Sequence, residues 1–299
     1  MTGARGTVVG ALIPTNSPAS SVTLPFFIAV ATVVFVSVGQ SSAAPAQQQP
    51  KTVSPDQIAT SDDETALKVR QAAEQGDAAA QFNLGWLYAE GRGVPQDDAQ
   101  AVQWYRKAVA QGNAAAQFNL GWMYSQGRGV LQDDAQAVQW YRKAAEQGLA
   151  LAQGNLGWMY DRGRGVPQDD AQAVQWYRKA AEWGFAVAQF NLGRMYDGGR
   201  GVLQDYEQAV RWYRNAATQG LAAAQASLGW LYSQGQGVTQ DYVEAHKWLS
   251  LAAARSSGEE QKKNATGRDA LARLMSPEQI ADAQKRARDW MEAFEQREK

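Results

Sequence analysis

Few side chains in this 299-residue sequence are suited to chemistry, and they are widely spaced. His246 is the only histidine, and the absence of cysteine excludes disulfides, thiolate metal sites and thiol nucleophiles. Paired aspartates recur at Asp97-Asp98, Asp133-Asp134 and Asp169-Asp170. Because an enzyme holds a nucleophile, a base or a metal in fixed geometry, these residues are the candidates for such a role.

The paired aspartates have the spacing of helix caps. Three residues after the first Asp of each pair comes a Gln, as in Asp97 and Gln100, which is the pattern of a capping box. A second acidic residue in the first turn is favoured by the helix dipole. The pairs lie 36 residues apart, so we expect caps of successive helices and no catalytic pair.

His246 and the glycine-rich turns also have structural interpretations. His246 occupies a position at which the preceding units have valine, so we expect it to pack near the core side of a helix. The Gly-Arg-Gly triplets, such as 91–93, are not followed directly by a helix whose free N–H groups could hold a phosphate. The sequence therefore predicts a protein without catalytic residues, cofactor or metal site.

A 36-residue period runs through the middle of the chain. Gln81, Gly85, Tyr88 and Trp104 each recur at this interval through five units. The units are residues 77–112, 113–148, 149–184, 185–220 and 221–256. The first two units agree at 29 of 36 positions. Because a fixed period of this length is the signature of a repeat architecture, we expect each unit to be one supersecondary element.

Each unit is predicted to contain two helices, here named helix A and helix B. In the first unit helix A covers about 78–89 and ends before Gly91, since glycine is the usual left-handed residue after a helix. Helix B begins after the cap Asp97 and ends at Gly112. Gly85 lies beside the apolar side of helix A, where a missing side chain allows the two helices to approach closely. One unit cannot bury its apolar stripe alone, but five stacked units can.

The string LGWLYAEGRGVPQDDAQAVQWYRKAVAQG resembles the Sel-one-like repeat, a relative of the tetratricopeptide repeat. The resemblance covers about 77–256 and implies an all-α fold, a right-handed α-solenoid of about five 36-residue helix–turn–helix repeats. A half-unit from Thr65 to Gly76 precedes it, so we expect the solenoid over 64–256. Helical spacing and a capping box at Ser276 to Gln279 predict C-terminal capping helices within 257–299.

The N-terminal segment differs in composition from the repeats. Leu24 to Val38 is apolar and uncharged, and small residues follow it, which is the pattern of a secretory signal peptide. We therefore expect a signal peptide over 1–46, a disordered linker over 47–63, and a periplasmic or secreted protein. An uncleaved inner-membrane anchor is the alternative, and only in that case is a membrane expected as a partner.

The surface best suited to binding lies on helix A, opposite its core side. Most units carry an aromatic residue, an amide and a tryptophan there. In tetratricopeptide relatives helix A lines the concave groove, and the resemblance implies that an Asn at the position of Asn83 grips a ligand backbone. The candidate partner-binding residues are Phe82, Asn83, Trp86, Phe118, Asn119, Trp122, Asn155, Trp158, Asn191, Arg194 and Trp230. Packing of the same side chains between neighbouring helices is the alternative interpretation.

Two functions remain open at this point. The first is a non-catalytic exported scaffold or adaptor that binds a protein or peptide partner, with a cell-surface glycan as a further partner considered. The second is an envelope carbohydrate- or peptidoglycan-related enzyme, or a β-lactam-interacting protein, although the cysteines of such family members are missing. Nucleic acid is not expected as a partner, because 29 basic residues balance 30 acidic ones.

Overall fold

The computed structural model describes residues 55–297, with side chains from Glu64 onward. These residues form 13 helices and no strand, and the predicted α-solenoid of helix–turn–helix repeats is confirmed. The chain divides into two compact units. The N-terminal unit contains the described residues up to Leu149, and the C-terminal unit contains those from Ala150.

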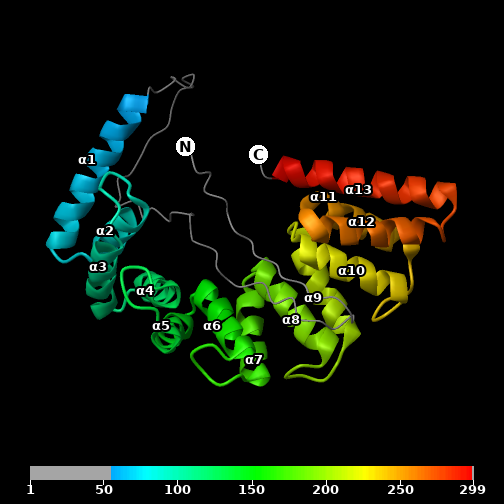
Figure 1. The fold of residues 1–299 in the computed structure, drawn as a ribbon, viewed down its shortest axis with the longest axis horizontal. Helices are drawn as coiled ribbons and strands as arrows, with labels where there is room; N and C mark the ends of the chain where they lie inside the picture. The colour runs from blue at the N-terminus through cyan, green and yellow to red at the C-terminus, as the bar shows by residue number, and fades with distance from the viewer. Residues whose placement is uncertain (1–54, 298–299) are drawn as a thin grey trace, which may run out of the picture. The chain divides into compact units, whose positions relative to one another are not determined.

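The N-terminal unit is a series of helices in which each helix packs on the next (Figure 1). Its helices are α1 (Pro55–Glu74), α2 (Ala78–Glu90), α3 (Asp98–Ala110), α4 (Ala114–Gln126) and α5 (Asp134–Glu146). Tyr105 of α3 is 2% exposed and packs in one cluster with Leu120 and Met123 of α4. Helix B of one repeat is therefore covered by helix A of the next.

The C-terminal unit continues this pattern and adds two helices (Figure 1). Its helices are α6 (Ala150–Arg162), α7 (Asp170–Glu182), α8 (Ala186–Gly198), α9 (Tyr206–Thr218), α10 (Ala222–Gln234), α11 (Tyr242–Arg255), α12 (Gly258–Ala272) and α13 (Pro277–Arg297). Both α12 and α13 pack on α11. The Trp290 ring of α13 stacks on Phe294 at 4.9 Å and meets Trp248 of α11 edge-on, as expected of a capping element.

The helix starts follow the predicted caps. The first aspartate of each pattern accepts a hydrogen bond from the backbone N–H three residues on, at 2.9 to 3.0 Å; these residues are Asp97, Asp133, Asp169, Asp205 and Asp241. Ser276 and Gln279 form the reciprocal box, with the Gln279 N–H donating to Oγ at 3.3 Å and the Ser276 N–H donating to Oε1 at 2.9 Å. The first aspartate of each pair is thus accounted for by a helix start.

Gly121 lies where α4 and α5 approach each other closely. A Cβ atom there would come within 3.0 Å of the Tyr141 ring, which is tighter than most side-chain contacts. Gly193 of the C-terminal unit meets Tyr213 in the same way, at 2.7 Å. The predicted close approach of helix A and helix B at this glycine is therefore confirmed in both units.

One boundary differs from the predictions. α1 begins at Pro55, so residues 55–63 of the expected linker are helical backbone, and the packing of α1 on α2 supplies the tertiary contact that a lone helix lacks. The two helices α12 and α13 lie within 257–299, where the capping helices were predicted. The expected signal peptide, with residues 47–54 of the linker, lies outside the described residues. Within residues 55–297, every helix is too short or too polar to cross a bilayer.

Candidate binding surface

The predicted binding residues lie on α2, α4, α6, α8 and α10, and the structure exposes them unequally. Trp230 has 46% of its surface accessible. The partly exposed members are Phe82, Asn83, Trp86, Asn119, Trp122 and Arg194. The buried members are Phe118, Asn155, Trp158 and Asn191. The exposed and partly exposed members are called accessible below.

For the four buried residues the structure favours the packing interpretation. Phe118 lies against the Tyr141 ring, with ring centroids 5.6 Å apart. Asn155 is 2% exposed, and its Nδ2 donates to the Leu151 carbonyl oxygen one turn earlier at 2.9 Å. A helical wheel cannot separate such residues from the accessible ones, because their burial depends on side chains of other helices.

Trp86 and Trp122 are the accessible tryptophans of the N-terminal unit. An arginine lies over each ring, Arg92 at 5.4 Å from the Trp86 centroid and Arg128 at 5.0 Å from the Trp122 centroid. Cation–π contacts of this kind stabilise by about 0.5–1 kcal/mol at exposed sites. The arginines therefore favour one orientation of each ring.

Asn119 is joined to the preceding repeat. Its Nδ2 donates to the Tyr105 hydroxyl oxygen at 3.1 Å. Burial raises the pKa of Tyr105 well above its usual value, so the hydroxyl stays protonated at neutral pH. The amide that was expected to hold a ligand is therefore already engaged through one of its donors.

The Gly-Arg-Gly turns join neighbouring repeats, a role that the sequence analysis did not identify. Arg128 donates through Nε and Nη2 to the two carboxylate oxygens of Asp98, at 2.9 and 2.5 Å. Gly129, with a φ of +64°, runs so close to Asp98 that a Cβ atom would collide with its carbonyl oxygen. The second aspartate of a pair thus holds the turn of the next repeat. In the sequence, this contact corresponds to an arginine and an aspartate that lie 30 residues apart, and no local pattern reveals it.

The same contact recurs in the C-terminal unit with an additional carboxylate. Arg200 pairs with Asp170 at 2.6 Å and with Asp161 at 2.6 Å. At the equivalent place in the N-terminal unit, Arg128 donates to the Ala89 carbonyl oxygen at 3.1 Å. The Asp161 side chain is 1% exposed, so Arg200 is its direct counter-charge inside the protein.

The last repeat keeps the close backbone contact without the ion pair. A Cβ atom at Gly237 would collide with the Tyr206 backbone, as one at Gly129 would collide with Asp98. Tyr206 and Gln236 stand where the preceding repeats have Asp and Arg. The path of the turn is therefore independent of these charges.

A second group of polar side chains surrounds Arg194 of α8. Asp197, one turn further along α8, accepts a hydrogen bond from the Tyr213 hydroxyl at 3.1 Å. Burial raises the pKa of Asp197, and burial lowers the pKa of Arg194. The Nη1 atom of Arg194 is buried and has no hydrogen-bond partner among the described residues. Arg194 therefore differs from the other candidate residues in being a charged group with an unused donor.

His246 lies in a packed position, as its place in the repeat predicted. The residue is 3% exposed, and its Nδ1 lies 3.4 Å from the Ser250 hydroxyl oxygen. Burial lowers the pKa of His246, so the neutral ring is favoured at pH 7. Within residues 64–297 no group of three or more His, Asp and Glu side chains is placed to hold a metal ion.

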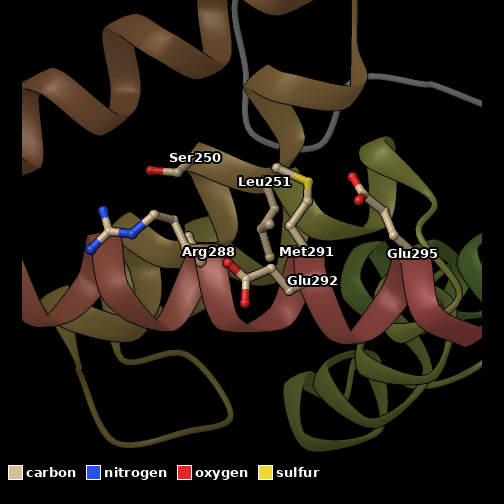
Figure 2. Close-up of a pocket in the computed structure, with 7 residues that line it drawn as sticks. Ser250, Leu251, Arg288, Met291, Glu292 and Glu295 are labelled. Atoms are coloured by element: carbon tan, nitrogen blue, oxygen red, sulfur yellow. The ribbon is translucent and has the colours of Figure 1, made fainter.

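A pocket of about 230 Å³ lies between α11 and α13 (Figure 2). It is lined by Ser250, Leu251, Ala287, Arg288, Met291, Glu292 and Glu295. Figure 2 shows that the charged side chains of Arg288, Glu292 and Glu295 extend in different directions and do not meet at one point. The arrangement lacks the convergent polar groups that fix a small ligand in a pocket.

Comparison with protein families matches the Sel1 repeat five times, at residues 78–113, 114–149, 150–184, 186–221 and 222–257. These bounds lie within one residue of the five predicted units. Proteins of this family generally bind other proteins and are generally non-catalytic. A search among curated proteins found no match to this chain.

Two solved structures are similar to this chain in sequence, and the first also shares its architecture. A Sel1 repeat protein from Oxalobacter formigenes is 34% identical, with a TM-score of 0.64, over 78% of this chain and 99% of that chain. A protective antigen of uropathogenic Escherichia coli that displays an SLR fold is 30% identical, with a TM-score of 0.40, over 78% of this chain and 64% of that chain. The five matched repeats, together with the Oxalobacter relative, place this chain in the Sel1 repeat family.

Proposed function

We propose that the chain is a non-catalytic exported scaffold that binds a protein or peptide partner along its helices A. The observation that carries the proposal is that one position of helix A presents an accessible tryptophan in three repeats, at Trp86, Trp122 and Trp230. Tryptophan is enriched at interface hot spots because it supplies a large, rigid contact area with a polar edge. The general binding of proteins by this family supports the same conclusion.

An extended segment of the partner is the occupant that fits these residues best. Trp86 and Trp122 occupy the same position in two consecutive repeats of the N-terminal unit, so one extended segment can contact both rings. The arginines over Trp86 and Trp122 hold the rings before binding and add a charged rim. Contacts of this kind are those of a pre-organised surface, in which little ordering is left for the moment of association.

Export is proposed from the composition of residues 24–38 and the small residues after them. The mature chain is expected to begin near Ala44 or Ala46, because small residues precede signal-peptidase cleavage. Mass spectrometry of the protein from the cell envelope measures this end. Recovery of the chain with Met1 intact contradicts cleavage and favours a retained anchor.

The binding surface is tested by a matched pair of tryptophan variants in one repeat. Trp122 lies on helix A and Trp140 on helix B; both are partly exposed, and each has a cation over its ring, Arg128 at 5.0 Å and Lys143 at 4.3 Å. The full chain is used to select random peptides displayed on phage. Trp122→Ala is expected to weaken binding of the selected peptides by about 2 kcal/mol or more, the loss typical of a hot spot. Trp140→Ala is expected to leave their binding unchanged.

Melting midpoints measured on both variants separate binding from folding. If Trp122→Ala unfolds at a much lower temperature than Trp140→Ala, the ring is a packing residue and the surface is misplaced. If the two variants melt alike and bind alike, the partner uses another face of the solenoid. If the unmodified chain selects no peptide, the proposal of a peptide-binding scaffold fails.

A further inference from the structure

One position of helix A departs from its pattern in a single repeat. Four repeats have tryptophan there, at Trp86, Trp122, Trp158 and Trp230, and the fourth repeat has Arg194. The side chain of Arg194 is only partly exposed on α8. The chain thus places a cation where every other repeat has an aromatic ring.

A second position of helix A carries a charge in the third and fourth repeats. Three residues further along helix A, the first, second and fifth repeats have Ala89, Ser125 and Ser233, whereas the third and fourth have Asp161 and Asp197. Both carboxylates act electrostatically on Arg194. The three charged residues therefore form one polar group within the C-terminal unit, confined to α6 and α8.

The two carboxylates are nevertheless bonded to other donors. Asp161 is held by Arg200 at 2.6 Å, and Asp197 accepts the Tyr213 hydroxyl at 3.1 Å. The Nη1 of Arg194 has no hydrogen-bond partner among the described residues. A buried charged donor without an acceptor is costly, and natural proteins seldom keep one without a reason. Arg194 is therefore not explained as one half of a structural ion pair.

The surroundings of Arg194 show where a ligand can approach. The equivalent residue of the preceding repeat, Trp158, is 7% exposed, whereas that of the following repeat, Trp230, is 46% exposed. Arg194 thus occupies the equivalent position one repeat before the exposed Trp230, whereas Trp158, one repeat before Arg194, is buried.

We propose that Arg194 is a specificity-determining residue, which pairs with a carboxylate of the bound partner while an apolar group of that partner lies on Trp230. This proposal rests on the proposed function. A planar guanidinium matches a carboxylate through paired hydrogen bonds, which a tryptophan at this position cannot make. Asp161 and Asp197 act electrostatically on the guanidinium, while their short contacts are made to Arg200 and to the Tyr213 hydroxyl. The carboxylate is either an acidic side chain or a free chain end.

The experiment selects random peptides on phage with the full chain and with three variants. Arg194→Trp restores the residue of the other four repeats, and Arg194→Gln removes the charge while keeping a polar side chain. Arg214→Gln is the matched control, because Arg214 is an exposed arginine of the adjacent helix B that bonds to the Tyr232 hydroxyl at 2.6 Å. One library displays the peptides internally and the other displays them with a free carboxyl end.

The unmodified chain and the Arg214→Gln variant are expected to select peptides with Asp or Glu at a fixed distance from an apolar residue. Enrichment in the internal library identifies a side-chain carboxylate, and enrichment confined to the other library identifies a chain end. Both variants of Arg194 are expected to lose the enrichment. For a selected synthetic peptide, replacing its carboxylate by an amide is expected to weaken binding to the unmodified chain about tenfold or more, and to leave binding to Arg194→Trp unchanged.

Three results distinguish this proposal from the proposed function. Acidic enrichment that persists in Arg194→Gln overturns the role of Arg194. If the selected peptides lack acidic residues but their binding still depends on Trp122, the proposed recognition of a carboxylate is overturned and the proposed function stands. Failure of the unmodified chain to select from either library overturns both. Circular dichroism and the melting midpoint of Arg194→Trp confirm that the variant is folded.

Discussion

The second and fourth repeats share their backbone plan and differ in what that backbone presents. In both, an arginine of the turn pairs with an aspartate 30 residues earlier, and a glycine passes against the same backbone. In the second repeat the arginine also lies over the accessible ring of Trp122, and the position three residues on is Ser125. In the fourth repeat the same two positions are Arg194 and Asp197. The turn therefore keeps the arrangement of neighbouring repeats constant, while the side chains on helix A differ and change the chemistry of the surface.

The two repeats also differ at the start of helix A. Asn113 caps α4 by accepting the Ala116 N–H at 2.8 Å, whereas Phe185 precedes α8 and makes no side-chain cap. A lost cap typically costs about 1 kcal/mol. The fourth repeat thus combines an uncapped start of helix A with the partly exposed charges of Arg194 and Asp197, neither of which favours stability.

The largest difference between the two repeats is expected when the turn arginine is removed. Arg200→Gln leaves the Asp161 carboxylate, 1% exposed, without its counter-charge, and breaking a buried pair costs about 3–5 kcal/mol. Arg128→Gln leaves Asp98, which is 28% exposed and can be solvated, so the expected cost is about 1 kcal/mol or less. Urea unfolding followed by circular dichroism measures both. Equal losses would show that Asp161 does not depend on Arg200.

Substitution of the turn glycines is expected to lower the free energy of unfolding equally in the two repeats. Gly129→Ala and Gly201→Ala each place a Cβ atom against the backbone of an aspartate, at φ values of +64° and +67°. Collision and the left-handed backbone together should cost about 2–4 kcal/mol in either unit. Gly112→Ala is the control, since its Cβ atom meets nothing within 4 Å, and only the backbone term of about 1–2 kcal/mol applies. Unequal losses at the two turn glycines would contradict a shared geometry.

A smaller effect is expected at the helix starts. Asn113→Ala removes the cap of α4 and should lower the free energy of unfolding by about 1 kcal/mol. Phe185→Asn supplies a cap to α8 but removes a partly buried ring, so the net change should be smaller than that of Asn113→Ala. The melting midpoints of the two variants give the comparison. A loss at Phe185→Asn that exceeds the loss at Asn113→Ala would show that the ring matters more than the missing cap.

The smallest effect is expected at Asp197, and it depends on pH. Burial raises the pKa of Asp197 in the folded chain above its ordinary value, so folding favours the protonated carboxyl. The stability that this preference provides is present below the ordinary carboxyl pKa, and it is lost as the pH rises through the raised value. Asp197→Asn stays neutral and should therefore gain in melting midpoint relative to the unmodified chain between pH 4 and pH 7. A constant difference between the two chains over this range would contradict the raised pKa.

The sequence predicted those parts of the fold that local patterns determine. Aspartate three residues before Gln or Glu located each start of helix B, and Gly121 located a close crossing, because both effects involve side chains within one repeat. The accessible and buried members of the candidate surface could not be separated. Trp122 and Trp158 are the same residue at the same position, yet one is partly exposed and the other is 7% exposed, because side chains of neighbouring helices differ.

The sequence also could not show which charged groups pair with one another. Arg194 and Arg200 both lie within reach of Asp161 electrostatically, and only the three-dimensional arrangement shows that Arg200 takes the short contact. Asp161 and Arg200 are 39 positions apart, which is more than one full repeat. Periodicity identifies which positions are equivalent, but it cannot show which of two candidate donors an acceptor will choose.

The link between Arg128 and Asp98 also bears on how such a chain grows by gene duplication. Because the arginine reaches back to the preceding repeat over an interval that the period preserves, an inserted 36-residue copy carries an aspartate for its successor and an arginine for its predecessor. Insertion between such repeats thus leaves every junction matched. The junction between Tyr206 and Gln236 has lost both charges, so a copy of the fourth repeat placed directly after itself would present its turn arginine with a tyrosine. The ion pair thus matches the earlier repeats to one another, whereas the fourth and fifth repeats are matched by the backbone contact of Gly237 alone.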